Sequence, residues 1–179
     1  MDLSPAMLRV ARLLHPTEGF LCADIETWGR SQSYDVATLF FVLHEMPQPA
    51  RRAALRNALR VSRRRVVVCD ISVGKVPSDL MLSGEPYLLN YQRNIVDDVH
   101  SVASEHAHVR VQLIEVVRDH VMVCVLEHDP GLGSESGPAQ VADADPALEG
   151  NAAMATSRWD DAAAATSTAP TSRRDRSSD

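Results

Sequence analysis

Residues 34–71, YDVATLFFVLHEMPQPARRAALRNALRVSRRRVVVCDI, decide the fold class of this chain. They hold two continuously apolar runs, 36–43 and 65–71, which are typical of parallel strands covered on both faces. Between these runs, residues 49–61 open with a proline and repeat apolar side chains at helical spacing, so we expect an amphipathic helix with a basic outer face. Strand, helix and strand in this order predict a parallel α/β unit.

The flanking segments extend the same pattern. We expect a helix over residues 5–14, because Ser4 can cap it and Pro5 suits its first turn. A short buried strand is expected over residues 20–23. Downstream, residues 86–106 have helical periodicity in two pieces, and 109–117 and 121–126 are typical of strands. The link between these two strands is too short for a parallel crossover, so they form an antiparallel hairpin.

Composition separates the end of the chain from the rest. The net charge is −6 at pH 7, and residues 129–179 hold nine acidic and four arginine side chains, which leaves the preceding part nearly neutral. The same segment is rich in alanine, glycine and serine and has almost no branched apolar residues. Such a composition cannot bury enough surface to offset its chain entropy. We therefore predict one folded domain over residues 1–128 and a disordered, low-complexity tail over 129–179.

Charge and hydropathy also bound the partners. A nearly neutral domain is not expected to gather nucleic acid or anionic lipid. No apolar stretch approaches the ~20 residues that a membrane-spanning helix needs. Seven arginines between residues 51 and 65 leave a nucleic-acid site open as an alternative, but no aromatic residues are interleaved for base stacking, and a solvated helix face explains them as well.

The cysteines and histidines predict no metal centre. Each cysteine sits inside an apolar run, which indicates buried thiols in a reducing, cytoplasmic compartment. His44-Glu45 does not begin an HExxH motif, because Gln48 stands where the second histidine is needed. Cys22, Cys69 and Cys124 form no CxxC pair, and His100, His106 and His108 lack convincing ligand spacing.

Four pieces of the sequence, in order, resemble the class I S-adenosylmethionine-dependent methyltransferase domain. Residues 2–8, DLSPAML, are similar to the helix start that follows the family's second strand. Residues 22–25 resemble the end of its third strand, 34–47 its fourth strand and following loop, and 66–71 its fifth strand. The resemblance implies an α/β, Rossmann-like sheet in the order 3-2-1-4-5-7-6, with only the seventh strand antiparallel.

The resemblance also implies a binding site for S-adenosylmethionine at the carboxyl ends of the parallel strands. Asp2 would accept hydrogen bonds from the ribose hydroxyls, and Asp24 from the adenine amino group, with the backbone of Ile25 nearby. Simpler readings stay open, namely an exposed terminal residue for Asp2 and a turn for Asp24. The other side chains expected around the cofactor are Met7, Leu39 and Phe40, and the last two could equally be core residues.

The loop after the expected fourth strand is where the family's acceptor pocket begins. His44 and Glu45 lie on it, so either could take a proton from an oxygen or nitrogen nucleophile. The segment between the fifth strand and the hairpin often shapes that pocket, and Tyr87 and Tyr91 are its expected substrate-binding residues. The resemblance therefore implies methyl transfer from S-adenosylmethionine to a small-molecule acceptor.

The sequence departs from the family at its beginning. Asp2 already corresponds to the last residue of the second strand, so the first strand, its glycine-rich turn and most of the second strand have no counterpart. We expect an N-terminally truncated, impaired methyltransferase whose neighbouring strand edges are either exposed or forced to pair directly. The alternative is a noncatalytic methyltransferase-like module for binding or regulation. The oligomeric state is not predicted.

Overall fold

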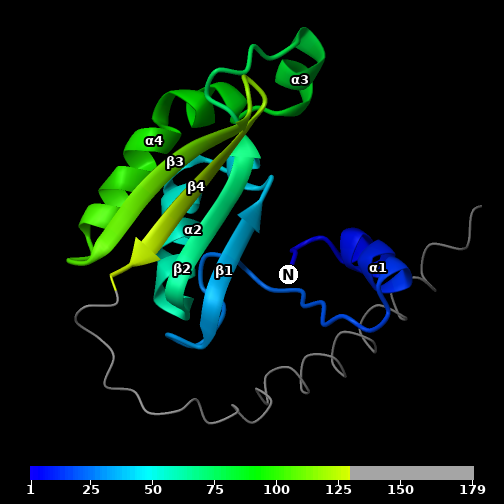
Figure 1. The fold of residues 1–179 in the computed structure, drawn as a ribbon. Coiled ribbons are helices and arrows are strands. Elements are labelled where there is room, and N and C mark those ends of the chain that lie inside the picture. The colour runs from blue at the N-terminus through cyan, green and yellow to red at the C-terminus, as the bar shows by residue number, and fades with distance from the viewer. Residues whose placement is uncertain (130–179) are drawn as a thin grey trace, which may run out of the picture.

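The structure, a computed structural model, describes residues 1–129. The predicted tail over 129–179 therefore lies, apart from Asp129, outside the described residues. The helices and strands alternate as Figure 1 shows. In chain order they are α1 (Pro5–Leu14), β1 (Tyr34–Phe40), a 3-10 turn (Leu43–Glu45), α2 (Gln48–Val61), β2 (Ser62–Ile71), α3 (Asp79–Gly84), α4 (Leu88–Ser104), β3 (Val109–Val117) and β4 (Val121–His128).

The strands form one four-stranded sheet in the order β1-β2-β4-β3. β1 and β2 are parallel, whereas β4 runs antiparallel to both β2 and β3. β3 therefore runs in the same direction as β2, and only β4 is reversed. This arrangement confirms the α/β fold class and matches the last four positions, 4-5-7-6, of the order expected from the sequence.

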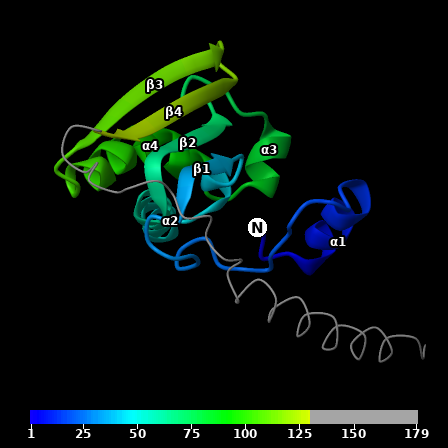
Figure 2. The same ribbon diagram turned by 60° about the horizontal axis from the view of Figure 1, so that its bottom comes forward.

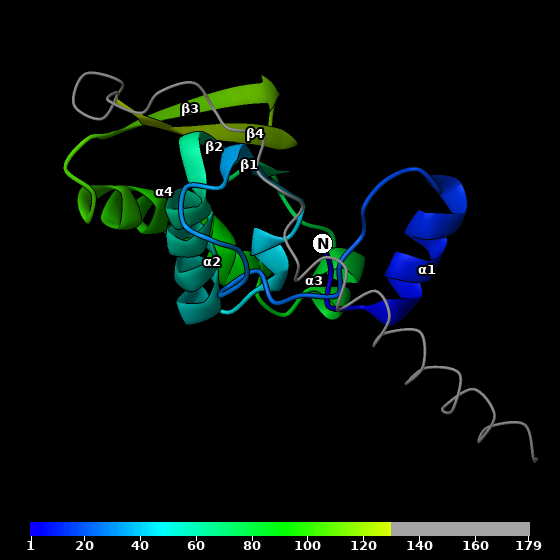
Figure 3. The same ribbon diagram turned by 90° about the horizontal axis from the view of Figure 1, so that it is seen from below.

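Helices α2 and α4 cover one face of the sheet, as the view from below in Figure 3 shows. Val66 and Val68 of β2 and Leu126 of β4 point into the core under these helices and are buried. The alternate residues of the same strands, Val67 and Val125, are only half-buried and pair across the opposite face. The core is therefore one-sided among the described residues.

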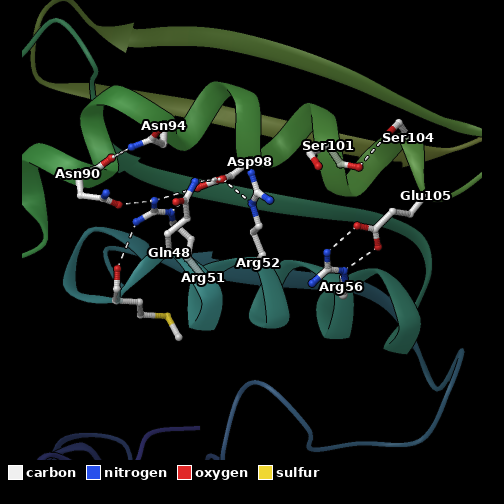
Figure 4. Close-up of polar contacts among 11 residues, drawn as sticks. Gln48, Arg51, Arg52, Arg56, Asn90, Asn94, Asp98, Ser101, Ser104 and Glu105 are labelled. Carbon is white, nitrogen blue, oxygen red and sulfur yellow. Dashed lines mark hydrogen bonds and ion pairs between the residues drawn. The ribbon is translucent and has the colours of Figure 1, made fainter.

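The two covering helices are joined by a buried polar cluster, shown in Figure 4. Arg51 of α2 and Asp98 of α4 are both fully buried, and the arginine Nε donates to the carboxylate at 2.8 Å. Asp98 also accepts from Gln48 and Arg52, each at 2.7 Å. Burial raises the pKa of Asp98, but the hydrogen bonds from Gln48, Arg52 and Arg51 outweigh burial and lower it. The buried charges are therefore paired and hydrogen-bonded, as burial requires.

The N-terminal part lies apart from the sheet in all three ribbon views. α1 begins at Pro5 as expected, with the Ser4 hydroxyl accepting from the Met7 amide. Its only buried residue is Leu8, and the apolar side chains of Met7, Leu13 and Leu14 are exposed. Most of the apolar face of α1 is therefore exposed to solvent.

The strand predicted over residues 20–23 is wrong. Asp2 and Cys22 form a single parallel bridge, with the Asp2 amide donating to the Leu21 carbonyl at 3.1 Å and the Ala23 amide to the Asp2 carbonyl at 3.3 Å. A strand needs a neighbour along its length, and only the residue at position 2 supplies one. Direct pairing with β1 does not occur, and no described strand lies against the outer edge of β1.

The cysteine prediction holds for one of three thiols. Cys124 is buried in the core, and burial raises its pKa to about 12. Cys69 is half-buried on the uncovered face of the sheet. Cys22 is exposed, so its predicted burial is wrong, because the segment around it lacks a covering layer.

Replacing the buried carboxylate tests the link between α2 and α4. Asp98→Asn removes the charge that faces Arg51 and leaves a buried guanidinium without a counter-ion. We expect the free energy of unfolding to fall by about 3–5 kcal/mol, measured by urea denaturation at pH 7.

The neighbouring Asp97 is exposed and provides the matched control. Asp97→Asn should change stability by less than about 0.5 kcal/mol. Equal effects of the two substitutions would contradict the assigned role of the buried pair.

Candidate active site

The candidate site lies where β1 and β2 end side by side. β1 stops at Phe40, and Phe41 adopts a left-handed backbone with φ 48° while its amide donates to the Cys69 carbonyl at 2.9 Å. A left-handed conformation costs a bulky side chain on the order of 1–2 kcal/mol. This turn ends the strand earlier than the predicted residue 43 and directs the chain into the 3-10 turn Leu43–Glu45.

Asp70, near the end of β2, fixes that turn. Its carboxylate is fully buried and accepts from the Leu43 amide at 2.9 Å and the Ile71 amide at 2.7 Å. The same carboxylate lies 2.6 Å from Nδ1 of His44. An ionised carboxylate only accepts, so Nδ1 carries the proton and donates to Asp70, which leaves Nε2 as the nitrogen that can act as a base.

Several negative charges surround the imidazole of His44. Burial lowers its pKa, but the hydrogen bond with Asp70 and the charges of Asp70, Glu85 and Glu45 outweigh burial and raise it above its ordinary value. Nε2 lies 3.8 Å from the nearer carboxylate oxygen of Glu85, which follows α3. The pair of His44 and Asp70 thus has the arrangement of a base oriented by a carboxylate.

The two predicted catalytic residues lie in different environments. His44 is 5% exposed and has the contacts described above, whereas Glu45 is exposed and affects His44 only through its charge. Asp70 and Glu85 were missed by the sequence analysis. Asp70 had a usable signal, because an acidic residue ending a buried strand beside another site-bearing strand meets it at the same sheet edge. Glu85 had none.

The two predicted substrate residues also diverge. Tyr87 is partly exposed at the start of α4. Tyr91 is fully buried, its hydroxyl donates to the Ile71 carbonyl at 2.9 Å, and its ring meets His44 edge-on at 6.1 Å between centroids. The hydroxyl of Tyr91 is therefore engaged by the core, and the contact with substrate stays a prediction for both residues.

The two predicted cofactor carboxylates lie on segments joined by the parallel bridge. Asp2 pairs with Cys22, which precedes Asp24 by two residues. Each carboxylate already accepts one local hydrogen bond, Asp2 from the Ser4 amide at 2.7 Å and Asp24 from the Glu26 amide at 2.9 Å. The turn-forming role left open for Asp24 is thus observed, and a role toward a ligand stays a prediction.

Helix α2 holds the loop that follows Asp24. The side-chain amide of Asn57 donates to the carbonyls of Ile25 and Trp28, both at 2.9 Å. Arg60 donates to the Gly29 carbonyl at 2.7 Å. The loop carrying the predicted adenine-binding backbone is thus tied to the same helix that packs under the sheet.

The apolar residues predicted around the cofactor are spread out. Leu39 is buried in the core, Phe40 is 59% exposed on the uncovered face of the sheet, and Met7 is exposed on α1. Ile25 is half-buried and packs against the core. The described residues do not gather these four side chains around one point.

The arginines of the basic helix face are engaged within the chain. Six of the seven between residues 51 and 65 make hydrogen bonds or ion pairs with described residues, and Arg56 and Arg63 do so with Glu105 and Asp35. Within residues 1–129, no group of three or more metal-ligating side chains is found. Nor does any helix in this part of the chain have the length and apolar character to span a membrane.

Comparison with known sequences finds a match to a family model described as a methyltransferase domain, over residues 1–73. The match covers 73 of the 179 residues, and the matched part contains both predicted cofactor carboxylates and the pair of His44 and Asp70. No curated protein matches the sequence.

A solved structure of low sequence identity is similar to this chain in fold. The PH0226 protein from Pyrococcus horikoshii OT3 is 11% identical, with a TM-score of 0.53, and the match covers 72% of this chain and 71% of that one. Magnesium protoporphyrin IX methyltransferase from Synechocystis PCC 6803, with bound SAH, is 14% identical, with a TM-score of 0.47. That match covers 72% of this chain and 62% of the Synechocystis enzyme, so the chain spans less than two thirds of that enzyme's length.

Removing the carboxylate behind His44 tests the electrostatics of the site. Asp70→Asn should lower the pKa of His44 by about one unit or more, measured by following the imidazole signals in an NMR titration. Because the folded pKa is raised, the stability linked to His44 is fully present below about pH 6.5 and is lost as pH rises through the folded pKa. Asp70→Asn should flatten this loss.

Asp35→Asn on β1 is the control, since Asp35 is exposed and pairs with Arg63. An unchanged His44 titration in the Asp70 variant would show that the carboxylate does not govern the imidazole.

Proposed function

We propose that residues 1–128 are a partial methyltransferase domain that transfers a methyl group from S-adenosylmethionine to a small-molecule acceptor. The observation that carries this proposal is the family match over residues 1–73, a segment that contains the paired His44 and Asp70. Methyl transfer depends mainly on aligning the acceptor with the methyl group, and such positioning is worth ~7–11 kcal/mol.

The described residues fit the adenosine end of the cofactor. Asp2 would hold the ribose hydroxyls and Asp24 the adenine amino group, beside the backbone of Ile25. The fit is supported by the bridge that joins residues 2 and 22 and by the remaining acceptor capacity of both exposed carboxylates. When bound, the cofactor supplies a methyl group already activated by its sulfonium.

His44 is the proposed general base. Asp70 holds the imidazole by Nδ1, so Nε2 takes the proton that an acceptor hydroxyl or amine releases as it forms its new bond to carbon. The residue must be neutral at Nε2 to do so. Replacement by glutamine should reduce the methyl-transfer rate by about 10²–10⁴-fold and leave cofactor binding unchanged.

The methionine end of the cofactor has no matching residues in the described part of the chain. Residues 1–129 contain four glycines, at positions 19, 29, 74 and 84, and none forms a glycine-rich turn after a strand. We therefore propose weak cofactor binding and impaired activity for these residues alone. A noncatalytic binding or regulatory module is the alternative function.

Calorimetry with S-adenosylmethionine tests the proposed cofactor. We expect measurable binding that Asp24→Ala weakens about tenfold or more, because a charge-assisted hydrogen bond contributes ~1.5–3 kcal/mol. Glu18→Ala, which removes an exposed carboxylate from the same segment, should bind like the wild type.

The outcomes separate the two functions. Binding of the cofactor without methyl transfer to pooled phenols and amines, assayed with a radiolabelled methyl group, would favour the noncatalytic module. Absence of any heat of binding at millimolar cofactor would contradict both the proposed cofactor and the proposed reaction.

A further inference from the structure

The segment between β2 and α4 is fixed at its ends and loosely packed between them. At one end, the Gln92 side chain donates to the carbonyls of Lys75, at 2.6 Å, and Ser72, at 3.3 Å. At the other end, Leu88 is buried in the core. Between them α3 has no fully buried residue, and Val76 and Leu80 are 84% and 83% exposed. Within α3, Met81 is half-buried and packs against the core, so movement of residues 76–87 would cost the core little more than this contact.

Glu85 is the residue of this segment that faces the candidate base. Its Oε2 atom is buried and makes no hydrogen bond within residues 1–129, although it lies 3.8 Å from Nε2 of His44. That separation is too long for a hydrogen bond but short enough for a strong charge interaction. An unsatisfied buried carboxylate oxygen is costly and normally has an explanation.

We propose that residues 76–87 form a lid over the active site. With the lid shut, the Glu85 carboxylate lies opposite Nε2 of His44, in the place that the acceptor would take. The proposal rests on the proposed function, since it assigns the blocked nitrogen as the base. His44 is only 5% exposed and Glu85 lies opposite its Nε2, so withdrawal of this segment would open that nitrogen to an acceptor.

The charges around His44 explain how the lid would be coupled to its protonation. Asp70 faces Nδ1, Glu85 faces Nε2, and Glu45 contributes its charge from the surface. The ring of Tyr91 meets the imidazole edge-on, and the Arg51 guanidinium lies 5.7 Å from the centre of that ring. Two close carboxylates favour a protonated imidazole with the lid shut. Withdrawal of Glu85 removes one of them and frees His44 to become a base.

Two variants of the full chain test the lid. Glu85→Gln keeps the size of the side chain and removes its charge, so the pKa of His44 should fall by about one unit in an NMR titration. Asp79→Asn removes an exposed carboxylate from the same segment and should leave the pKa of His44 unchanged. An unchanged titration in the Glu85 variant would overturn the proposal.

Hydrogen exchange supplies a second readout that is independent of the variant's stability. In the wild type, the amide of Leu88, which donates to the Glu85 carbonyl across the end of the segment, should lose protection as pH rises through the pKa of His44. The loss should be absent in His44→Gln. Protection that does not respond to pH would also overturn the lid.

Neither readout needs the cofactor or an acceptor. A fall in the pKa of His44 without any methyl transfer would refute the proposed function and leave the contact between the segment and His44 established.

Discussion

The parallel pairing of β1 with β2 is the constraint on which the site depends. The register places Phe40 of β1 opposite Cys69 of β2, so the two strands end at the same edge of the sheet. β1 is followed by Phe41 in its left-handed conformation, and Asp70 follows Cys69 in β2. A shift of one residue in β2 would turn the Asp70 side chain to the uncovered face of the sheet and away from His44. The turn at Phe41 and the buried carboxylate of Asp70 therefore depend on the same register of β1 and β2. The buried pair of Arg51 and Asp98 fixes α2 against α4, the two helices that cover this sheet.

Hydropathy patterns were sufficient to predict the four strands of the sheet and the hairpin, whereas their order came from the family resemblance. Continuous apolar runs identify β1 and β2, and the short link at Arg118 and Asp119 allows only an antiparallel hairpin. The patterns failed where a neighbour decides the outcome. Residues 20–23 have the composition of a buried strand but find one bridge at Cys22, and the end of β1 depends on the backbone of Phe41, which hydropathy does not record.

The site was predictable only in part, for the same reason. His44 stands out because it follows a buried strand, but its partners come from 26 residues downstream at Asp70 and from the segment after α3 at Glu85. A hydrogen bond over such a separation has no local signal. One arginine of the basic helix was also misjudged. The sequence suggests a solvated helix face, whereas Arg51 is fully buried and paired with Asp98.

Figure 2 shows that the helices cover one face of the sheet and that α1 lies apart from the sheet. Asp2 lies beside α1, the loop after Asp24 is hydrogen-bonded to α2, and His44 lies in the turn after β1. The proposed function requires these segments to meet at one site, with the cofactor at Asp2 and Asp24 and the base at His44. Mapping amide chemical shifts of the full chain during addition of S-adenosylmethionine tests it most directly. The account predicts changes at Asp2, at residues 24–28 and at residues 41–45 together. Saturating cofactor that moves none of these signals, or only signals elsewhere, would contradict it.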